Sequence, residues 1–375
     1  TSRCFAKTFP PASEIRMFSA PPKYLLGPLT QWVEDHFQLS KATLLSLPSE
    51  RDAVFLVQVT NHPKYILKIA NPDESWDFLE AQNGMMERLA KQTSDNCQVI
   101  VNRFGKTISQ WVDLDGRPCA VRLLSFVPGE VLAEVSYRSP ELLENIGSYL
   151  GRLDAALIGF HHSALVRTLP WDLQQGRQVV QQLRRHVPPG PLVQQIERCL
   201  QLYDRDVAPV ADELPRSVIH NDANDHNILV EVTNDVTNDC VTGLIDFGDS
   251  LESWTVGELA ITLAYLLLDT DDVWAVIVPV VRGYHRQRPL TEVEMQVLFP
   301  LVLLRLCTSV VMAAEGLSRD PDNRYLQISQ QPVQATLPRL LKISTRLATA
   351  VIRDACDLPP VAHVESWTQW LTTKR

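Results

Sequence analysis

The residues best suited to chemistry lie in the stretch SVIHNDANDHNILVEV, residues 217–232. A segment of His, Asp and Asn side chains separates two short apolar runs that are typical of strands. Two interpretations are open for this segment. It is either a surface turn, in which Asn and Asp bond their own backbone, or a site that binds phosphate and a metal ion.

Three residues of this segment have a spacing with chemical meaning. His220, Asp222 and Asn227 fit H-x-D-x-x-x-x-N, which is the spacing of a kinase catalytic loop. In such a loop the aspartate accepts the proton of the acceptor hydroxyl, and the asparagine five residues later holds a metal ion. The match is weak by itself, because short motifs also arise by chance.

Two further segments occur in the order that phosphoryl transfer requires. Asp246 begins Asp-Phe-Gly after the strand-like TGLI, where a second metal-binding carboxylate is expected. Oxygen ligands of this kind suit Mg²⁺. Lys68 lies in the apolar YILKIA, where it could simply face solvent. Its position upstream of the other two segments favours a contact with the α- and β-phosphates. Together the three segments favour the phosphate and metal site over the surface turn.

The elements that must position these residues change in kind along the chain. Residues 28–127 alternate strand-like and helical patterns and predict a small sheet with one packed helix, including a hairpin turn at residues 113–116. Residues 128–375 are dominated by helical patterns, and residues 1–27 form a proline-rich lead-in. The prediction is an α+β chain with a small β-rich N-terminal lobe and a large helical C-terminal lobe.

Composition narrows the class of protein. A formal net charge of −9 without a basic cluster argues against a nucleic-acid partner. Seven scattered cysteines without a C-x-x-C pair favour free thiols in a reducing cytosol. The apolar stretch from Val297 is interrupted by Pro300 and Arg305, so we expect a buried helix and no membrane span. These features predict a cytoplasmic protein.

Three segments carry a resemblance to a known family: SVIHNDANDHNILV, GLIDFGDS and RLLSFVPGEVL. From about Leu29 to the end of the helical region, the chain resembles the aminoglycoside phosphotransferase and choline kinase-like family. LPSERDAVFLV and YILKIANP resemble its hydroxylysine kinase branch most. The resemblance implies a protein-kinase-like fold, in which residues 28–127 bind the nucleotide and residues 128–375 carry catalysis and acceptor binding.

The resemblance also implies the co-substrates and the roles of individual residues. It implies ATP or GTP as phosphoryl donor, Mg²⁺ as cofactor and a small molecule with a hydroxyl group as acceptor. The residues with an implied role are Asp222 as catalytic base, Asn227 and Asp246 as metal ligands, Lys68 as phosphate anchor, and the backbone at Ser125 and Val127 as contacts to adenine.

The chain departs from the family pattern in four places. Asn221 replaces the usual Gly of the loop, and Glu258 replaces the usual Asp after the metal motif. No glycine-rich loop precedes Lys68, because PSERDA occupies that turn. Gln82 falls where a glutamate would pair with the lysine. The partner of the lysine on the following helix therefore stays open among Glu80, Gln82 and Glu87.

Acidic residues around the motifs suggest a cationic acceptor. Asp225, Asp249 and Glu252 flank the catalytic elements, and Trp254 offers an aromatic face. Carboxylates and cation–π contacts would favour an amine on the acceptor. The alternative is that these acids simply lie at loop ends of an acidic protein.

The resulting prediction is a small-molecule kinase that transfers the γ-phosphoryl group of ATP or GTP to a hydroxyl. The expected acceptor is an amino alcohol or a hydroxy-amino acid, of the hydroxylysine, homoserine, ethanolamine or choline type. Two alternatives stay open. One is an aminoglycoside-modifying phosphotransferase, and the other is an inactive nucleotide-binding regulatory protein, which the missing glycine loop would fit.

Overall fold

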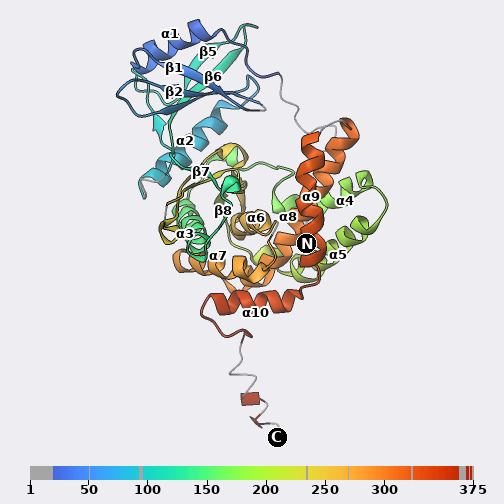
Figure 1. Ribbon diagram of the computed structural model, residues 1–375. Coiled ribbons are helices and arrows are strands. Elements are labelled where there is room, and N and C mark those ends of the chain that lie inside the picture. The colour runs from blue at the N-terminus through green and yellow to red at the C-terminus, as the bar shows by residue number, and fades with distance from the viewer. Residues whose placement is uncertain are drawn as a thin grey trace, which may run out of the picture. The chain divides into compact units, whose positions relative to one another are not determined.

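The structure of the protein is a computed structural model. The chain divides into two compact units, Thr1–Val127 and Pro128–Arg375. The described residues are 20–49, 51–92, 96–233, 235–268, 270–321, 324–362, 369–370 and 372–373. Figure 1 draws the first unit in blue to teal and the second in green to red.

The first unit is built on an antiparallel sheet with the strand order β1-β2-β3-β6-β4, and β5 also pairs with β6. Its strands are β1 (Thr43–Leu47), β2 (Ala53–Gln58), β3 (Tyr65–Ile69), β4 (Val99–Ile100), β5 (Ser109–Val112) and β6 (Pro118–Ser125). Burial alternates along β2, as the two-residue period of a strand requires. Each face of the sheet can therefore pack against a different helix.

Two helices cover the two faces of this sheet. Helix α1 (Leu26–Phe37) buries Leu29 and Val33 in a cluster with Phe55 and other core residues of β2, β3 and β6. Helix α2 (Trp76–Ala90) lies on the other face, where Leu79 joins a separate buried cluster. The prediction of one packed helix was incomplete, since the sheet has one helix on each face.

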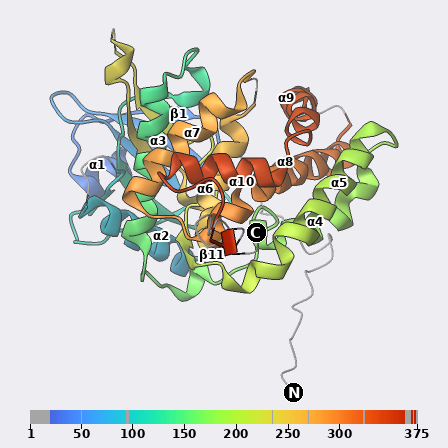
Figure 2. The same cartoon turned by 90° about the horizontal axis from the view of Figure 1, so that it is seen from below.

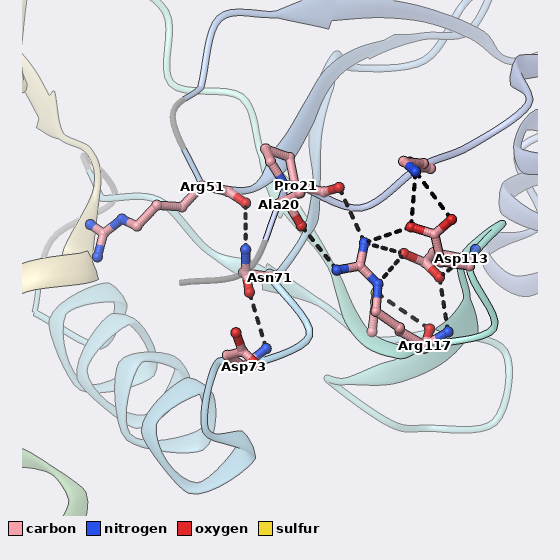
Figure 3. Close-up of polar contacts among 10 residues, drawn as sticks. Ala20, Pro21, Arg51, Asn71, Asp73, Asp113 and Arg117 are labelled. Carbon is pink, nitrogen blue, oxygen red and sulfur yellow. Dashed lines mark hydrogen bonds and ion pairs between the residues drawn. The ribbon is translucent and has the colours of Figure 1, made fainter. Parts of the chain in front are cut away.

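The hairpin between β5 and β6 turns at the predicted position. Asp113 Oδ1 accepts hydrogen bonds from the backbone N–H groups of Asp115 and Arg117, both at 2.9 Å. Gly116 has φ +78°, a left-handed conformation that glycine adopts without steric cost. Arg117 closes the turn through a 2.7 Å bond from Nη2 to Asp113 Oδ2, as Figure 3 shows.

The second unit is mainly helical. Its helices are α3 (Pro140–Leu157), α4 (Leu173–Leu183), α5 (Pro191–Asp206), α6 (Val256–Leu266), α7 (Val273–Gln287), α8 (Glu292–Arg319), α9 (Arg324–Leu340) and α10 (Thr345–Ala355). Its strands are β7 (Glu130–Val131), β8 (Arg216–Ile219), β9 (Ile228–Glu231), β10 (Cys240–Leu244) and β11 (Leu251–Trp254). They form two small sheets, β10-β9-β7 and β11-β8.

Helix α8 is the central helix of this unit and packs against α4, α5, α6, α9 and α10. Figure 2 shows it surrounded by these helices. Within the described residues it is the one helix long and apolar enough to cross a membrane, but 83% of its most apolar window is buried in the protein. It is therefore a core helix, and its single arginine in that window, Arg305, lies inside the unit.

Candidate active site

The two motifs of the second unit are brought together by strand pairing. The loop 220–227 connects β8 to β9, β8 pairs with β11, and β9 pairs with β10. Asp246 lies two residues after the end of β10. Ile245 N donates to Asn227 O at 3.0 Å, so the metal-motif segment lies beside the end of the loop.

The buried His220 joins the same two segments. Its Nε2 donates to Ile245 O at 3.0 Å, and its Nδ1 accepts the N–H of Asp222 at 3.3 Å. Because the carbonyl can only accept and the amide can only donate, these contacts select the Nε2-protonated tautomer. The ring also packs edge-on against Phe247, with 4.8 Å between centroids. His220 therefore shapes the loop and is shielded from solvent.

The Asp222 carboxylate is held by three side chains. Its Oδ2 accepts from Asn227 Nδ2 at 2.8 Å, and its Oδ1 accepts from Asn224 Nδ2 at 3.0 Å and Arg305 Nη2 at 3.3 Å. Burial raises the pKa of Asp222 to about 6, against the lowering effect of the Arg305 charge. The carboxylate is thus ionised at neutral pH, and its side chain stays 26% exposed.

Arg305 was not recognised from the sequence as a site residue. Its guanidinium donates to Trp171 O at 2.9 Å and to the Tyr265 hydroxyl at 3.3 Å, besides Asp222. It also lies over the rings of Trp171 and Tyr265, 4.7 and 5.5 Å from their centroids. The available signal was an arginine within a long apolar helix, because a buried charge needs a partner.

The two departures from the family pattern in this region lie against each other. Asn221 has φ +67°, a left-handed conformation that asparagine tolerates better than most residues other than glycine. The carboxylate of Glu258 accepts the backbone N–H groups of His220 and Asn221. Burial raises the pKa of Glu258 to about 7, although these N–H donors lower it. Glu258 therefore holds the backbone of the loop through these two hydrogen bonds.

Two residues of this region offer oxygen ligands to a metal ion. Asn227 uses its Nδ2 for both of its side-chain bonds, to Asp222 O and Oδ2, which leaves its amide oxygen as a ligand. Asp246 has φ +64° and an exposed position after β10. The negative charges of Asp249 and Asp246 both raise the pKa of Asp222, so three carboxylates share this region.

These ligands fit a hard, water-retaining ion. Among the described residues, no group of three or more His, Cys, Asp and Glu side chains forms a metal site of its own. Mg²⁺ is commonly bound by one or two protein oxygens together with waters and substrate phosphates. The amide oxygen of Asn227 and the carboxylate of Asp246 are such a donor set.

A cavity of about 820 Å³ opens next to this loop within the second unit. Asp225 lines it, as do Arg138 and the aromatic residues Trp171 and Tyr265. Sequence reasoning had pointed to Asp225 alone among these. The aromatic residues and Arg138 carried no local signal, because they come from separate segments that only the fold brings together.

The other expected acceptor contacts do not line this cavity. Glu252 lies 3.9 Å from both Arg216 and His161, which makes it part of a loose surface ion-pair group. Trp254 is 6% exposed within β11, and Asp249 lies in the short turn after Asp246. Of the four expected acceptor contacts, Asp225 is the one that lines this cavity.

In the first unit, Lys68 lies half-buried on β3, opposite Val54 of β2 and Arg122 of β6. Arg122 is 3% exposed and donates to Gln82 Oε1 at 2.8 Å. Gln82 therefore already accepts a hydrogen bond from β6, the strand that pairs with β3. The remaining candidates for a carboxylate beside the lysine, Glu80 and Glu87, are exposed on α2.

Two residues of the segment that replaces a glycine-rich loop, Arg51 and Asp52, are bonded to Asn71. Asn71, just after β3, donates from Nδ2 to Arg51 O at 3.2 Å and from its backbone N–H to Asp52 Oδ1 at 3.0 Å. Its Oδ1 accepts the N–H of Asp73 at 3.1 Å. Figure 3 shows Asn71 between Arg51 and Asp73. The turn between β1 and β2 is thus tied to the end of the strand that carries Lys68.

The expected adenine contacts lie at the end of β6. Ser125 donates its N–H to Gln98 O at 2.8 Å, and its hydroxyl accepts the N–H of Gln98 at 2.8 Å. Ser125 O accepts a long bond, 3.5 Å, from the thiol of Cys97. Val127 is the last residue of the first unit and is 9% exposed.

Comparison with known proteins gives consistent results. The model of the phosphotransferase enzyme family matches residues 43–293. A hydroxylysine kinase of Mus musculus is 30% identical over 337 residues, which cover 83% of this chain and 88% of that protein. A homoserine kinase of Pseudomonas aeruginosa strain LESB58 is 28% identical over 211 residues, 52% of this chain and 62% of that protein.

Solved structures show the fold. An amicoumacin kinase superposes with a TM-score of 0.61 at 16% identity, covering 92% of this chain and 97% of that one. A microcompartment-associated aminopropanol kinase gives 0.59 at 18% identity, covering 89% of this chain and 100% of that one. The predicted α+β, kinase-like fold, with an antiparallel N-terminal sheet and a mainly helical remainder, is confirmed.

Proposed function

The chain belongs to the phosphotransferase enzyme family, and we propose that it is a small-molecule kinase that acts with Mg²⁺. It transfers the γ-phosphoryl group of ATP or GTP to a hydroxyl of an amino alcohol or a hydroxy-amino acid. One observation carries this proposal: Asp222, Asn227 and Asp246 come from one loop and the adjoining segment, and hydrogen bonds from Asn227 and Arg305 orient the Asp222 carboxylate.

Asp222 is the catalytic base in this proposal. Its carboxylate accepts a hydrogen bond from the acceptor hydroxyl and takes the proton as the oxygen bonds to the γ-phosphorus. The bond from that phosphorus to the bridging oxygen breaks, and the nucleoside diphosphate leaves. Asn227 and Asp246 would hold a metal ion, which would supply positive charge to the phosphate oxygens. Hydrogen bonds from Asn227 and Arg305 keep the carboxylate in one orientation.

The first unit supplies nucleotide binding in this proposal. Residues 28–127 bind the donor, with Lys68 at the α- and β-phosphates and the backbone at Ser125 and Val127 at the base. The hydrogen bonds from Asn71 to Arg51 and Asp52 support this role, because they hold these two residues beside the end of the strand that carries Lys68. Residues 128–375 carry catalysis and acceptor binding.

The acceptor carries an ammonium group in this proposal. Asp225 contributes a carboxylate to the lining of the cavity, and Trp171 and Tyr265, residue types that make cation–π contacts, line it as well. A cytoplasmic location is proposed as well. It is supported by the cysteines of the described residues, which are all free thiols.

The two alternatives have less support. An aminoglycoside carries several ammonium groups, whereas the lining of the cavity offers one carboxylate and also a guanidinium. An inactive regulatory protein would have no need to keep Asp222, Asn227, Asp246 and Lys68 together. The experiment that tests the proposal also tests both alternatives.

The experiment is nucleotide consumption with ATP and GTP in the presence of Mg²⁺. The acceptors are hydroxylysine, homoserine, ethanolamine, choline and kanamycin. We expect turnover with at least one amino acid or amino alcohol and none with kanamycin. Nucleotide binding without turnover on any acceptor would favour an inactive protein, and the absence of nucleotide binding would refute the proposal.

A further inference from the structure

We call the cavity of about 820 Å³ beside the loop 220–227 the acceptor cavity. Its lining has an unusual charge balance for a site that binds an amine. Apart from tyrosines, its ionisable side chains are Arg138, Asp225 and His226. With a neutral histidine, the guanidinium and the carboxylate cancel. A site for a simple cation would instead carry a surplus of negative charge.

Arg138 and Asp225 face each other loosely. Arg138 Nη2 lies 3.4 Å from Asp225 Oδ2, and the two side chains are 22% and 16% exposed. Ion pairs with strong hydrogen bonds are shorter, about 2.7–2.9 Å. The same Nη2 donates to Leu132 O at 3.3 Å. Arg138 makes no other hydrogen bond within the described part of the chain, so its Nε and Nη1 donors are available to a ligand.

The backbone ties this pair to the catalytic loop. Ala133 N donates to Asp225 O at 2.8 Å, which fixes the segment of Arg138 against the loop. Asp225 follows Asp222 by three residues in that loop. Tyr265 also lines the cavity, and its hydroxyl accepts from the same Arg305 Nη2 that bonds Asp222. Tyr265 thus links the cavity that holds the charge pair to Arg305, which bonds the base.

We propose that the acceptor is a free amino acid that binds as a zwitterion. Arg138 binds its α-carboxylate, Asp225 binds its α-ammonium group, and the hydroxyl on its side chain reaches Asp222. This inference rests on the proposed kinase function and adds the carboxylate to it. The apolar lining from Val276 and Met312 accommodates the methylene groups between the two ends.

The charge argument excludes the simpler acceptors. An amine without a carboxylate would occupy Asp225 and leave the largely buried guanidinium of Arg138 without its partner, which costs free energy. A zwitterion replaces one ion pair by two, so both protein charges stay paired. The same reasoning disfavours choline, ethanolamine and polycationic aminoglycosides.

The test compares each amino acid with its decarboxylated partner. Hydroxylysine is paired with the amino alcohol obtained by decarboxylating it, and homoserine with aminopropanol. For the wild-type protein we expect a preference for the amino acid of about 30- to 100-fold in kcat/KM, as for one charged hydrogen-bonded contact. A wild-type preference for the amino alcohol would overturn the proposal.

Arg138→Met is the decisive variant. It should lower kcat/KM for the amino acid by about 30- to 100-fold, mainly through KM, and leave the amino alcohol unchanged or improved. Arg138→Lys should retain part of the preference because it retains the charge. If Arg138 only holds the loop in place, both acceptors of a pair lose activity equally, and the proposal is wrong.

Asp225→Asn is the complementary variant. Both members of each pair carry the ammonium group, so both should lose activity by similar factors. Arg177→Met serves as the matched control, because Arg177 forms an ion pair at 2.7 Å with Asp204 away from the cavity. This control should leave both kcat/KM values as in the wild type.

A binding measurement gives a readout that does not need catalysis. Lysine and cadaverine lack the hydroxyl and differ only by the carboxylate, so calorimetry can compare their affinities. We expect lysine to bind more tightly to the wild type and the difference to disappear in Arg138→Met. If nucleotide binds but no acceptor turns over, the proposed function fails. If amino acids turn over with a preference that Arg138→Met leaves intact, this inference alone fails.

Discussion

Two buried polar clusters of the second unit are chemically alike and differ in their access to solvent. In the first, Arg305 contacts Asp222 and the hydroxyl of Tyr265. In the second, Arg288 contacts Glu294 and the hydroxyl of Tyr284. Each cluster therefore joins an arginine, a carboxylate and a tyrosine, but only the first borders the acceptor cavity.

The difference lies in the carboxylate. Glu294 is fully buried, and its bond from Arg288 is 2.7 Å long. Asp222 is 26% exposed, its contact to Arg305 is 3.3 Å, and it has further bonds from Asn224 and Asn227. The sealed pair can only stabilise the packing of helices. The open pair leaves the carboxylate oriented and able to exchange a proton.

The sealed cluster shows what complete burial does to ionisation. Asp154 joins it by accepting the hydroxyl of Tyr284. Burial raises the pKa of Asp154 well above its usual value, and burial likewise raises the pKa of Tyr284. Asp222 escapes such a large shift because the Arg305 charge and its partial exposure favour the ionised form.

The largest effect should come from removing the base of the open cluster. Asp222→Asn should lower kcat by about 10²- to 10⁴-fold, because general base catalysis contributes that much. The melting temperature and the affinity for nucleotide should stay close to the wild type. Steady-state kinetics and calorimetry measure both, and a variant with full activity would remove Asp222 from the mechanism.

Exchanging the two arginines for methionine tests the comparison directly. Arg305→Met should lower kcat by about 10- to 100-fold, because Asp222 loses a charged hydrogen bond that orients it. Arg288→Met should leave kcat of the folded protein unchanged but lower the free energy of unfolding by about 3–5 kcal/mol, because Glu294 is left unpaired.

Urea unfolding and kinetics on both variants would separate these effects. The comparison is wrong if Arg288→Met reduces kcat as strongly as Arg305→Met does. It is also wrong if neither variant changes kcat, since Arg305 would then be a structural residue like Arg288.

The pH dependence of activity follows from Asp222 and its contact with Arg305. The pKa of Asp222 is about 6 in the folded protein, and the base must be ionised. Activity should therefore fall below pH 6, by about tenfold for each further pH unit. The Arg305 charge lowers this pKa, so Arg305→Met should move the acid limb to higher pH. A pH profile of kcat/KM, which reports the free enzyme, checks both, and an acid limb that does not move would contradict the assignment.

The smallest effect is expected for an acidic residue outside the cavity. Glu252→Gln should change kcat/KM for the acceptor by less than about twofold, because its surface ion pairs are long and contribute little. A loss comparable to that of Asp225→Asn would show that Glu252 takes part in acceptor binding.

Much of this architecture was readable from local sequence. The spacing of His220, Asp222 and Asn227 and the position of Asp246 after a strand predicted a loop between strands with the metal motif nearby. The alternation of apolar residues in β2 and β3 predicted the sheet. Such features are readable because strand period, turn chemistry and motif spacing depend on neighbours in the chain.

The partners of the buried charges were not readable. Arg305 looked like an interruption of an apolar helix, and Gln82 looked like a failed partner of Lys68 although it accepts from Arg122. Asp225, Asp249 and Glu252 looked equivalent, yet one of them lines the cavity.

The sequence by itself therefore determined the order of the motifs, the change from strands to helices, and the residues able to do the chemistry. The tertiary structure decided which guanidinium faces which carboxylate, and which acids and aromatic rings share a cavity. The physical reason is that a buried charge is stable only beside a partner, and packing brings that partner from a distant segment whose position no local pattern encodes.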